Sequence, residues 1–200
     1  MFLKINSQNP EPEKIEQAVK VIQNGGIIVY PTDTIYGLGC DIFNKKAILK
    51  IYQLKKRESK KPLSIICQDI KEVAQYAIIP DYAFAILKKY LPGSFTFILK
   101  ARSQTPKTVL AKNKTVGIRI PDNNLCLEIV KKLGNPIITT SLNISGQKVL
   151  TNPNQLDKEM QNKIDLLIDS GTLGQEPSTV VDLSSDAPII LRKGKGIITL

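Results

Sequence analysis

Short apolar runs rich in β-branched residues alternate with amphipathic segments, and this alternation constrains the fold more than any other feature of the chain. Residues 11–24 carry apolar side chains at the spacing of one helical face, and residues 27–30 follow as a run that suits a strand buried on both faces. Further helices are predicted over 45–56, 80–90 and 125–132, and further strands over 62–67, 95–99, 115–120, 137–140, 166–168, 179–181 and 189–191. The alternation indicates a layered α/β domain.

The size and composition are those of a single folded domain spanning residues 1–200. No apolar run approaches the roughly 20 residues that a membrane span needs, so no membrane partner is expected. The N-terminus lacks the pattern of a secretory signal, and the three cysteines are too few and too scattered for a disulfide framework or a zinc site. We expect a soluble, cytoplasmic protein.

The chain contains no histidine, which excludes Ser-His-Asp and Cys-His catalysis and removes the commonest protein ligand of transition metals. It carries 28 Lys and Arg against 18 Asp and Glu, a net charge of +10. Such a charge attracts nucleotides, RNA or acidic partners, but a lysine-rich solvated surface has the same composition. Charge alone therefore leaves both interpretations open.

A cationic run, KKRESKK over residues 55–61, stands at the end of one predicted helix. Cations at this place complement the helix dipole, so a solvated helix end is one interpretation. Pro62 and Leu63 follow as a stiff turn into an apolar strand, which would hold Arg57 and Lys61 near a sheet edge. Guanidinium and ammonium groups held there would bind phosphate.

Two polar loops follow predicted strands, where ligands bind in open α/β sheets. Residues 139–146 are rich in hydroxyls and an amide, and residues 31–39 include two glycines that would allow close backbone approach to a ligand. The alternative for 139–146 is a polar turn that bonds to its own backbone. Arg119 stands among apolar strand residues, so it needs either an internal carboxylate or an anionic ligand as its partner.

Seven segments together resemble the YrdC/Sua5 family over residues 11–196: PTDTIYGLGCD, KKRESKKPL, PGSFTFIL, TVGIRIP, TTSLNISG, EPSTVVD and LRKGKG. The resemblance implies an α/β, YrdC-like fold, in which a twisted mixed β-sheet flanked by helices surrounds a deep, positively charged cavity. It also implies an L-threonylcarbamoyladenylate synthase, which forms threonylcarbamoyl-AMP and pyrophosphate from L-threonine, bicarbonate and ATP. This is the first stage of making N6-threonylcarbamoyladenosine at position 37 of tRNA.

The motifs also carry residue roles across from the family. The resemblance implies a catalytic set of Lys55, Arg57, Ser141 and Asn143. It implies an ATP site formed by Lys55, Arg57, Ser59, Thr115, Ser141, Asn143 and Arg192. The residues expected around L-threonine are Thr32, Arg119, Thr139 and Ser178, with Arg119 as the partner of the carboxylate. Mg²⁺ is expected to arrive with ATP, and no protein metal ligands are implied.

The chain departs from the family pattern at three places. Lys56 and Glu58 stand where the family often has Gly and Pro, and Ile66 stands where some relatives have a histidine. We expect the short TsaC-like form, without the extra C-terminal domain of longer Sua5 proteins, because the sequence resembles that form more closely. The K-x-R pattern, which the YciO branch lacks, argues against placing the chain in that branch.

Two other hypotheses stay open from the sequence. The first is a non-catalytic RNA-binding module of the same fold, which would bind tRNA or double-stranded RNA. The second is a relative that forms a carbamoyl adenylate for another acceptor, as in hydrogenase-maturation carbamoyltransferases. For the synthase, enzymes that transfer the threonylcarbamoyl group to tRNA are further expected partners.

Overall fold

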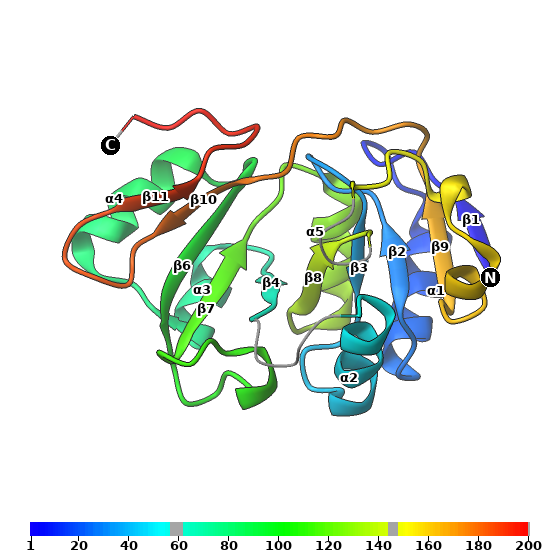
Figure 1. Cartoon of the computed structure of the whole chain (residues 1–200), viewed down its shortest axis with the longest axis horizontal. Helices are drawn as coiled ribbons and strands as arrows, with labels where there is room; N and C mark the ends of the chain where they lie inside the picture. The colour runs from blue at the N-terminus through cyan, green and yellow to red at the C-terminus, as the bar shows by residue number, and fades with distance from the viewer. Residues whose placement is uncertain (57–61, 144–147, 200) are drawn as a thin grey trace.

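The computed structural model describes residues 1–56, 62–143 and 148–199 (Figure 1). Within these residues, eleven strands form one twisted mixed sheet in the order β1-β9-β2-β3-β8-β4-β7-β6-β10-β11, with β5 paired to β6. The strands are β1 (Phe2–Lys4), β2 (Ile28–Tyr30), β3 (Gly37–Gly39), β4 (Ser64–Ile66), β5 (Ala77–Ile78), β6 (Phe95–Ala101), β7 (Thr115–Arg119), β8 (Ile137–Ser141), β9 (Leu166–Asp169), β10 (Thr179–Asp182) and β11 (Ile189–Arg192). The sheet extends along the long axis of the molecule (Figure 1).

Six α-helices flank the sheet in the described part of the chain: α1 (Pro12–Gln23), α2 (Lys45–Leu54), α3 (Ile70–Tyr76), α4 (Asp81–Tyr90), α5 (Asn124–Leu133) and α6 (Lys158–Gln161). Two short 3₁₀ segments, η1 (Lys107–Val109) and η2 (Pro153–Gln155), complete the elements. None of these helices is both long enough and apolar enough to cross a bilayer. The predicted α/β class and the helices flanking a mixed sheet are confirmed.

Strand β2 is buried on both faces, as its apolar run predicts. Ile28 and Tyr30 pack in one cluster with the apolar faces of α1 and α5, whereas Val29 packs in the other cluster, which includes α2. Helices α1 and α5 contact each other on their side of the sheet. This arrangement places two hydrophobic layers around the strands.

The helix boundaries follow the capping signals in the sequence. Asn44 caps α2, because its Oδ1 accepts a hydrogen bond from the Ala47 amide at 3.0 Å. The helix ends at Leu54, two residues before the predicted end, with Lys55 as its C-cap. Lys56 then adopts a φ of +47°, in the left-handed region that favours glycine. Because glycine adopts a positive φ without strain, this backbone conformation explains why the family often has glycine at this position.

The C-terminal third of the chain completes the sheet at two distant places, which confirms that its short strands belong to the same sheet. Strand β9 inserts between β1 and β2, and β10 and β11 extend the opposite end beyond β6. The chain therefore crosses the sheet between residues 169 and 179 (Figure 1). This crossing brings the last motifs of the chain beside β6 and β7.

The two glycines of β3 allow close internal packing, and Gly37 also lines the cavity described below, so the predicted ligand approach stays a prediction. A Cβ on Gly37 would lie 3.0 Å from the Tyr30 ring, and a Cβ on Gly39 would lie 2.4 Å from the Ile138 carbonyl oxygen. Tyr30 is fully buried and packs beside both glycines. The glycines therefore allow the pairing of β2, β3 and β8 around this ring.

Candidate functional site

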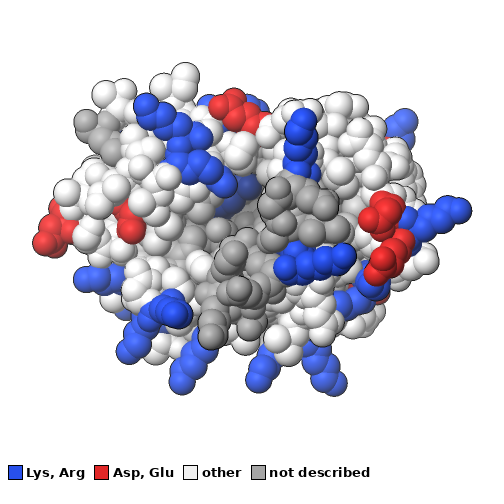
Figure 2. Space-filling view, in the orientation of Figure 1, with Lys and Arg blue, Asp and Glu red and all other residues white. Residues whose placement is uncertain are grey.

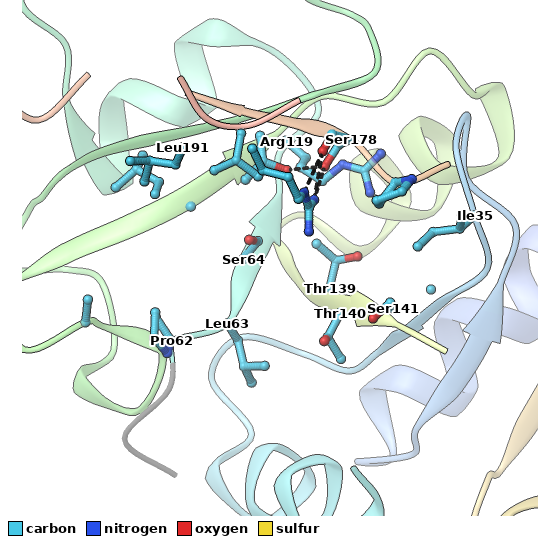
Figure 3. Close-up of a pocket in the computed structure, with 18 of the residues that line it drawn as sticks. Ile35, Pro62, Leu63, Ser64, Arg119, Thr139, Thr140, Ser141, Ser178 and Leu191 are labelled. Carbon is cyan, nitrogen blue, oxygen red and sulfur yellow. Dashed lines mark hydrogen bonds between the residues drawn. The ribbon is translucent and has the colours of Figure 1, made fainter. Parts of the chain in front are cut away.

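A cavity of about 550 Å³ opens on one face of the sheet (Figure 3). Five strands, β8, β4, β7, β6 and β10, form its floor. On β6, β7 and β10 the lining residues alternate, because every second side chain of a strand points to the same face. One row of the floor pairs residue to residue across the sheet: Thr139, Ser64, Gly117, Ile98 and Asp182. Motifs that are far apart in the sequence therefore meet at one surface.

Gly117 has no side chain and so leaves space above the cavity floor. A Cβ at this position would lie 2.6 Å from the Ser64 Oγ and 3.2 Å from the Thr96 Cγ2. Any side chain here would also occupy space that belongs to the cavity, which Gly117 lines. Sequence reasoning did not single out this glycine, because its importance depends on the neighbours that the sheet register supplies.

Arg119 lies on the cavity wall and pairs with an internal carboxylate. Its Nη2 donates to the Asp33 Oδ1 at 2.7 Å and to the Thr34 Oγ1 at 3.1 Å. The side chains of Arg119 and Asp33 are only 8% and 5% exposed. The sequence left open whether the arginine meets a carboxylate or reaches a pocket, and the structure shows that it does both.

A second arginine lies beside the first, at the same end of the cavity. Arg192 donates through Nε and Nη2 to the carbonyl oxygen of Ser178, at 3.1 and 2.8 Å. The Ser178 hydroxyl in turn shares a 2.8 Å hydrogen bond with the Thr96 hydroxyl. Partial burial and, next, the positive charge of Arg119 lower the pKa of Arg192. An anion bound here would relieve the repulsion between the two guanidinium groups.

Lys55 and the polar loop after β8 meet in space, as their predicted common site requires. The Lys55 Nζ donates to the Ser141 carbonyl oxygen, to the Asn143 carbonyl oxygen at 2.8 Å and to the Asn143 Oδ1 at 3.0 Å. The Ser141 hydroxyl donates to the same Oδ1 at 2.6 Å. Ser141 and Asn143 line the cavity, whereas Lys55 is 1% exposed and lies outside the lining. In this structure, the ammonium group holds the loop.

The remaining predicted site residues divide between the cavity and its surroundings. Thr115 and Thr139 line the cavity, and the Thr139 Oγ1 accepts a 2.8 Å hydrogen bond from the Tyr30 hydroxyl. Thr32 does not line it, because its hydroxyl donates to the Ile35 carbonyl at 2.6 Å and closes its own turn. Arg57 and Ser59 lie outside the described residues. Their roles, like those of the other site residues, stay predictions.

Apolar side chains form another part of the lining, which sequence reasoning missed. Ile98, Val180 and Leu191 contribute this apolar surface, near Thr115 and Asp182. The available signal was the strand period of two, since Val180 and Asp182 alternate on β10 with residues of the other face. Apolar surface beside hydroxyls and guanidinium groups suits a ligand that has both an anionic part and a less polar part.

The charges around the cavity are mainly positive. Arg119, Arg192 and Asp182 are the charged side chains among the described lining residues. Figure 2 shows Lys and Arg side chains around a hollow near the middle of this face, with Asp and Glu side chains nearer the edges. Within residues 1–56, 62–143 and 148–199, no group of three or more Cys, Asp or Glu side chains is placed to hold a metal ion.

The chain is similar to proteins of known sequence and structure over nearly its whole length. Escherichia coli YciO, which is named an uncharacterized protein, is 36% identical over 98% of this chain and 96% of its own. Its crystal structure has a TM-score of 0.93 and covers 98% of this chain and 97% of YciO. This similarity does not support the separation from the YciO branch that the K-x-R pattern predicts.

Two further relatives have names that state a function or a ligand. Bacillus subtilis threonylcarbamoyl-AMP synthase is 34% identical over 90% of this chain and 53% of its own. The crystal structure of Pyrococcus abyssi Sua5 complexed with L-threonine is 29% identical, with a TM-score of 0.90, over 97% of this chain and 57% of that chain. A family model that is described as "Telomere recombination" and covers Sua5, YciO and YrdC proteins matches residues 20–194. This chain therefore belongs to the Sua5/YciO/YrdC family.

Proposed function

We propose that this protein is an L-threonylcarbamoyladenylate synthase, which forms threonylcarbamoyl-AMP and pyrophosphate from L-threonine, bicarbonate and ATP. One observation carries the proposal: all seven family motifs supply residues to the lining of one cavity of about 550 Å³. The KKRESKKPL motif contributes Pro62 and Leu63 to this lining, and its buried Lys55 contacts the lining residue Asn143. Relatives named threonylcarbamoyl-AMP synthase and the L-threonine complex of Sua5 support the same activity.

The cavity offers separate surroundings for the two organic substrates. For L-threonine, the proposal assigns Arg119 to the carboxylate, with Thr139 and Ser178 beside it, since these three line the same cavity. For ATP, it assigns the cavity-lining residues Thr115, Ser141, Asn143 and Arg192, together with Arg57 and Ser59. Lys55 acts on ATP through the loop that it holds, because its Nζ contacts the backbone of Ser141 and Asn143. Thr32 shapes the adjoining turn.

Magnesium enters this scheme as part of the ATP substrate. Phosphate oxygens of ATP and water molecules would supply most of its ligands, because Mg²⁺ usually keeps several waters and needs few protein carboxylates. Asp182 is the carboxylate in the described cavity lining, and its Oδ1 already accepts a 2.8 Å hydrogen bond from the Ser184 amide. A single side chain of this kind fits a metal that the nucleotide carries.

The chemistry requires positioning and charge stabilisation. The neutral amine of L-threonine attacks the carbon of CO₂ and loses one proton, which gives a carbamate. Bicarbonate supplies the CO₂ by taking up one proton and losing water. A carbamate oxygen then attacks the α-phosphorus of ATP, and the bond from that phosphorus to the bridging oxygen of pyrophosphate breaks. The guanidinium groups hold two anions against their mutual repulsion while this bond forms. The chain has no histidine to act as a base, and no protein nucleophile is needed.

The proposal is tested by pyrophosphate release. Purified protein with Mg-ATP and bicarbonate should release pyrophosphate only when L-threonine is present, and the adenylate product should appear by mass spectrometry. Arg119→Lys keeps the charge but loses the planar fork, so its KM for L-threonine should rise by about tenfold or more. Absence of threonine-dependent release would refute the proposal.

Because the chain is similar to YciO over nearly its whole length, L-threonine should be compared with other amino acids as the substrate. If another amino acid supports faster pyrophosphate release than L-threonine, the adenylation chemistry stands and the acceptor assignment changes. In a panel of alternatives, serine tests the methyl group of threonine, valine tests its hydroxyl group, and glycine tests the whole side chain. In the full proposal, the adenylate passes to enzymes that modify tRNA, and transfer to tRNA in a reconstituted mixture is the measurement that tests this step.

A further inference from the structure

The carboxylate of Asp33 contacts Arg119, a residue of the cavity lining. Arg119 lines the cavity, whereas Asp33 lies behind it, outside the lining. The Arg119 Nη2 donates to the Asp33 Oδ1 at 2.7 Å, and the two side chains are almost completely shielded from water. A buried ion pair is a weak source of stability, because its desolvation costs about as much as its attraction returns. Its position suggests that it orients the guanidinium group.

Asp33 is itself fixed from two other directions. The Ser94 hydroxyl donates to the Asp33 Oδ2 at 3.0 Å, so each carboxylate oxygen has a donor. The Lys195 Nζ donates to the Asp33 backbone oxygen and ties the turn to the C-terminal segment. The carboxylate cannot rotate without breaking one of these contacts. Asp33 therefore presents a rigid acceptor to Arg119.

Among the buried donors of the guanidinium group, this arrangement leaves one unsatisfied. The Arg119 Nε is buried and has no hydrogen-bond partner among the described residues. A buried donor without a partner is unfavourable, and native proteins rarely keep one without a functional reason. The ion pair at Nη2 holds the group in this orientation despite that cost. A ligand carboxylate is the acceptor that would best satisfy a charged N–H donor in this place.

We propose that Asp33 is a positioning residue, which holds Arg119 so that its remaining N–H donors face the carboxylate of a bound amino acid. The inference rests on the proposed function, in which Arg119 is the partner of that carboxylate. It adds that the affinity for the amino acid depends on a second carboxylate, which the substrate never touches. The affinity for ATP does not share this dependence.

Asp33→Asn tests the inference by keeping the shape of the side chain and removing its charge. We expect the KM for L-threonine to rise by about tenfold, while the KM for ATP stays within about twofold. Glu72→Gln is the matched control, since Glu72 is another buried carboxylate, and it accepts a 2.7 Å hydrogen bond from the Gln68 amide. Equal increases in the two KM values, or an unchanged KM for L-threonine, would overturn the inference.

Ser94→Ala provides a milder test that keeps the ion pair and so avoids a loss of folding. It removes the hydrogen bond to the Asp33 Oδ2. We expect a smaller rise in the KM for L-threonine, of about threefold, again with little change for ATP. If this variant and Asp33→Asn raised the two KM values together, the pair would be structural only.

A second measurement does not depend on catalysis. The Nε–H of Arg119 should give a slowly exchanging signal in ¹⁵N NMR spectra, assigned by its loss in Arg119→Lys, and added L-threonine should shift it. In Asp33→Asn this signal should exchange with solvent at least about tenfold faster. Unchanged protection in the variant would overturn the positioning role. If the signal behaves as expected but the wild-type protein releases no pyrophosphate, the proposed function fails and the positioning role stands.

Discussion

Substitution of Lys55 can distinguish a structural role of its ammonium group from a direct role in phosphate binding. It is 1% exposed, and its ammonium group contacts the Ser141 carbonyl, the Asn143 carbonyl and the Asn143 Oδ1. Lys55→Met keeps the length of the side chain and removes the ammonium group. The loop after β8 then loses its link to the end of α2.

The magnitude follows from the contacts that this change removes. Hydrogen bonds to a charged group contribute about 1.5–3 kcal/mol each, and buried acceptors left without a donor add a penalty. The acceptors share one ammonium group and are not additive, and removing the buried charge returns part of its desolvation cost. We therefore expect a loss of about 3 kcal/mol in the free energy of unfolding. For a chain of this size, the melting temperature should fall by about 6–12 °C.

Thermal and urea unfolding followed by circular dichroism measure this loss. Lys56→Met is the matched control, since Lys56 is the next residue and its side chain is exposed. It should stay within about 0.5 kcal/mol of the wild type. The reasoning would be refuted if Lys55→Met unfolded at the wild-type temperature. If it did so while losing ATP affinity, the ammonium group would contact the phosphates instead of the loop.

Three other outcomes follow from the same structure. Gly117→Val should abolish pyrophosphate release in a protein that still folds, because its Cβ alone would lie 2.6 Å from the Ser64 Oγ, and near-wild-type kcat/KM would contradict the proposed cavity floor. Lys56 has a φ of +47°, which glycine adopts with less strain than lysine, so Lys56→Gly should raise the melting temperature by about 1–3 °C. A decrease would show that the lysine side chain stabilises the turn. Burial raises the pKa of the thiols of Cys40, Cys67 and Cys126, so Ellman's reagent at pH 8 should label none of them until urea unfolds the chain. Rapid labelling without urea would contradict the burial of these cysteines.

The sequence predicts most of the helices and strands because their local signals agree with the fold. The Asn44 cap and the apolar spacing after it define α2, and Ile48, Ile51 and Tyr52 at this spacing are buried. Strand β3, by contrast, has the sequence Gly-Leu-Gly, which has low strand propensity. It forms because the ring of Tyr30 packs beside both glycines and because β2 and β8 pair with it. Such tertiary reasons leave no local pattern.

Tertiary contacts limit the prediction of the candidate site from the sequence in the same way. Arg119 is predictable, because an arginine in an apolar strand needs a partner, but its partner Asp33 is 86 residues away and the sheet topology alone brings them together. Thr32 shows the opposite case: the family pattern places it near the amino acid, yet its hydroxyl bonds to the Ile35 carbonyl. Short-range bonds from side chain to backbone compete with ligand contacts, and a sequence does not show which of them wins.

The charge balance of the cavity predicts that the cationic run of residues 55–61 takes part in binding the phosphates of ATP. Among the described lining residues, two arginines face one aspartate, and Asp33 already offsets the charge of Arg119. Little positive charge is then left for a triphosphate beside an amino-acid carboxylate. Lys55, the first cation of the run, binds the loop oxygens. The phosphates would therefore depend on magnesium and on the later cations of the run, of which Arg57 is the one that the family pattern selects. This need for charge, which the described lining residues do not supply, is the physical reason to expect a large loss of ATP affinity in Arg57→Ala.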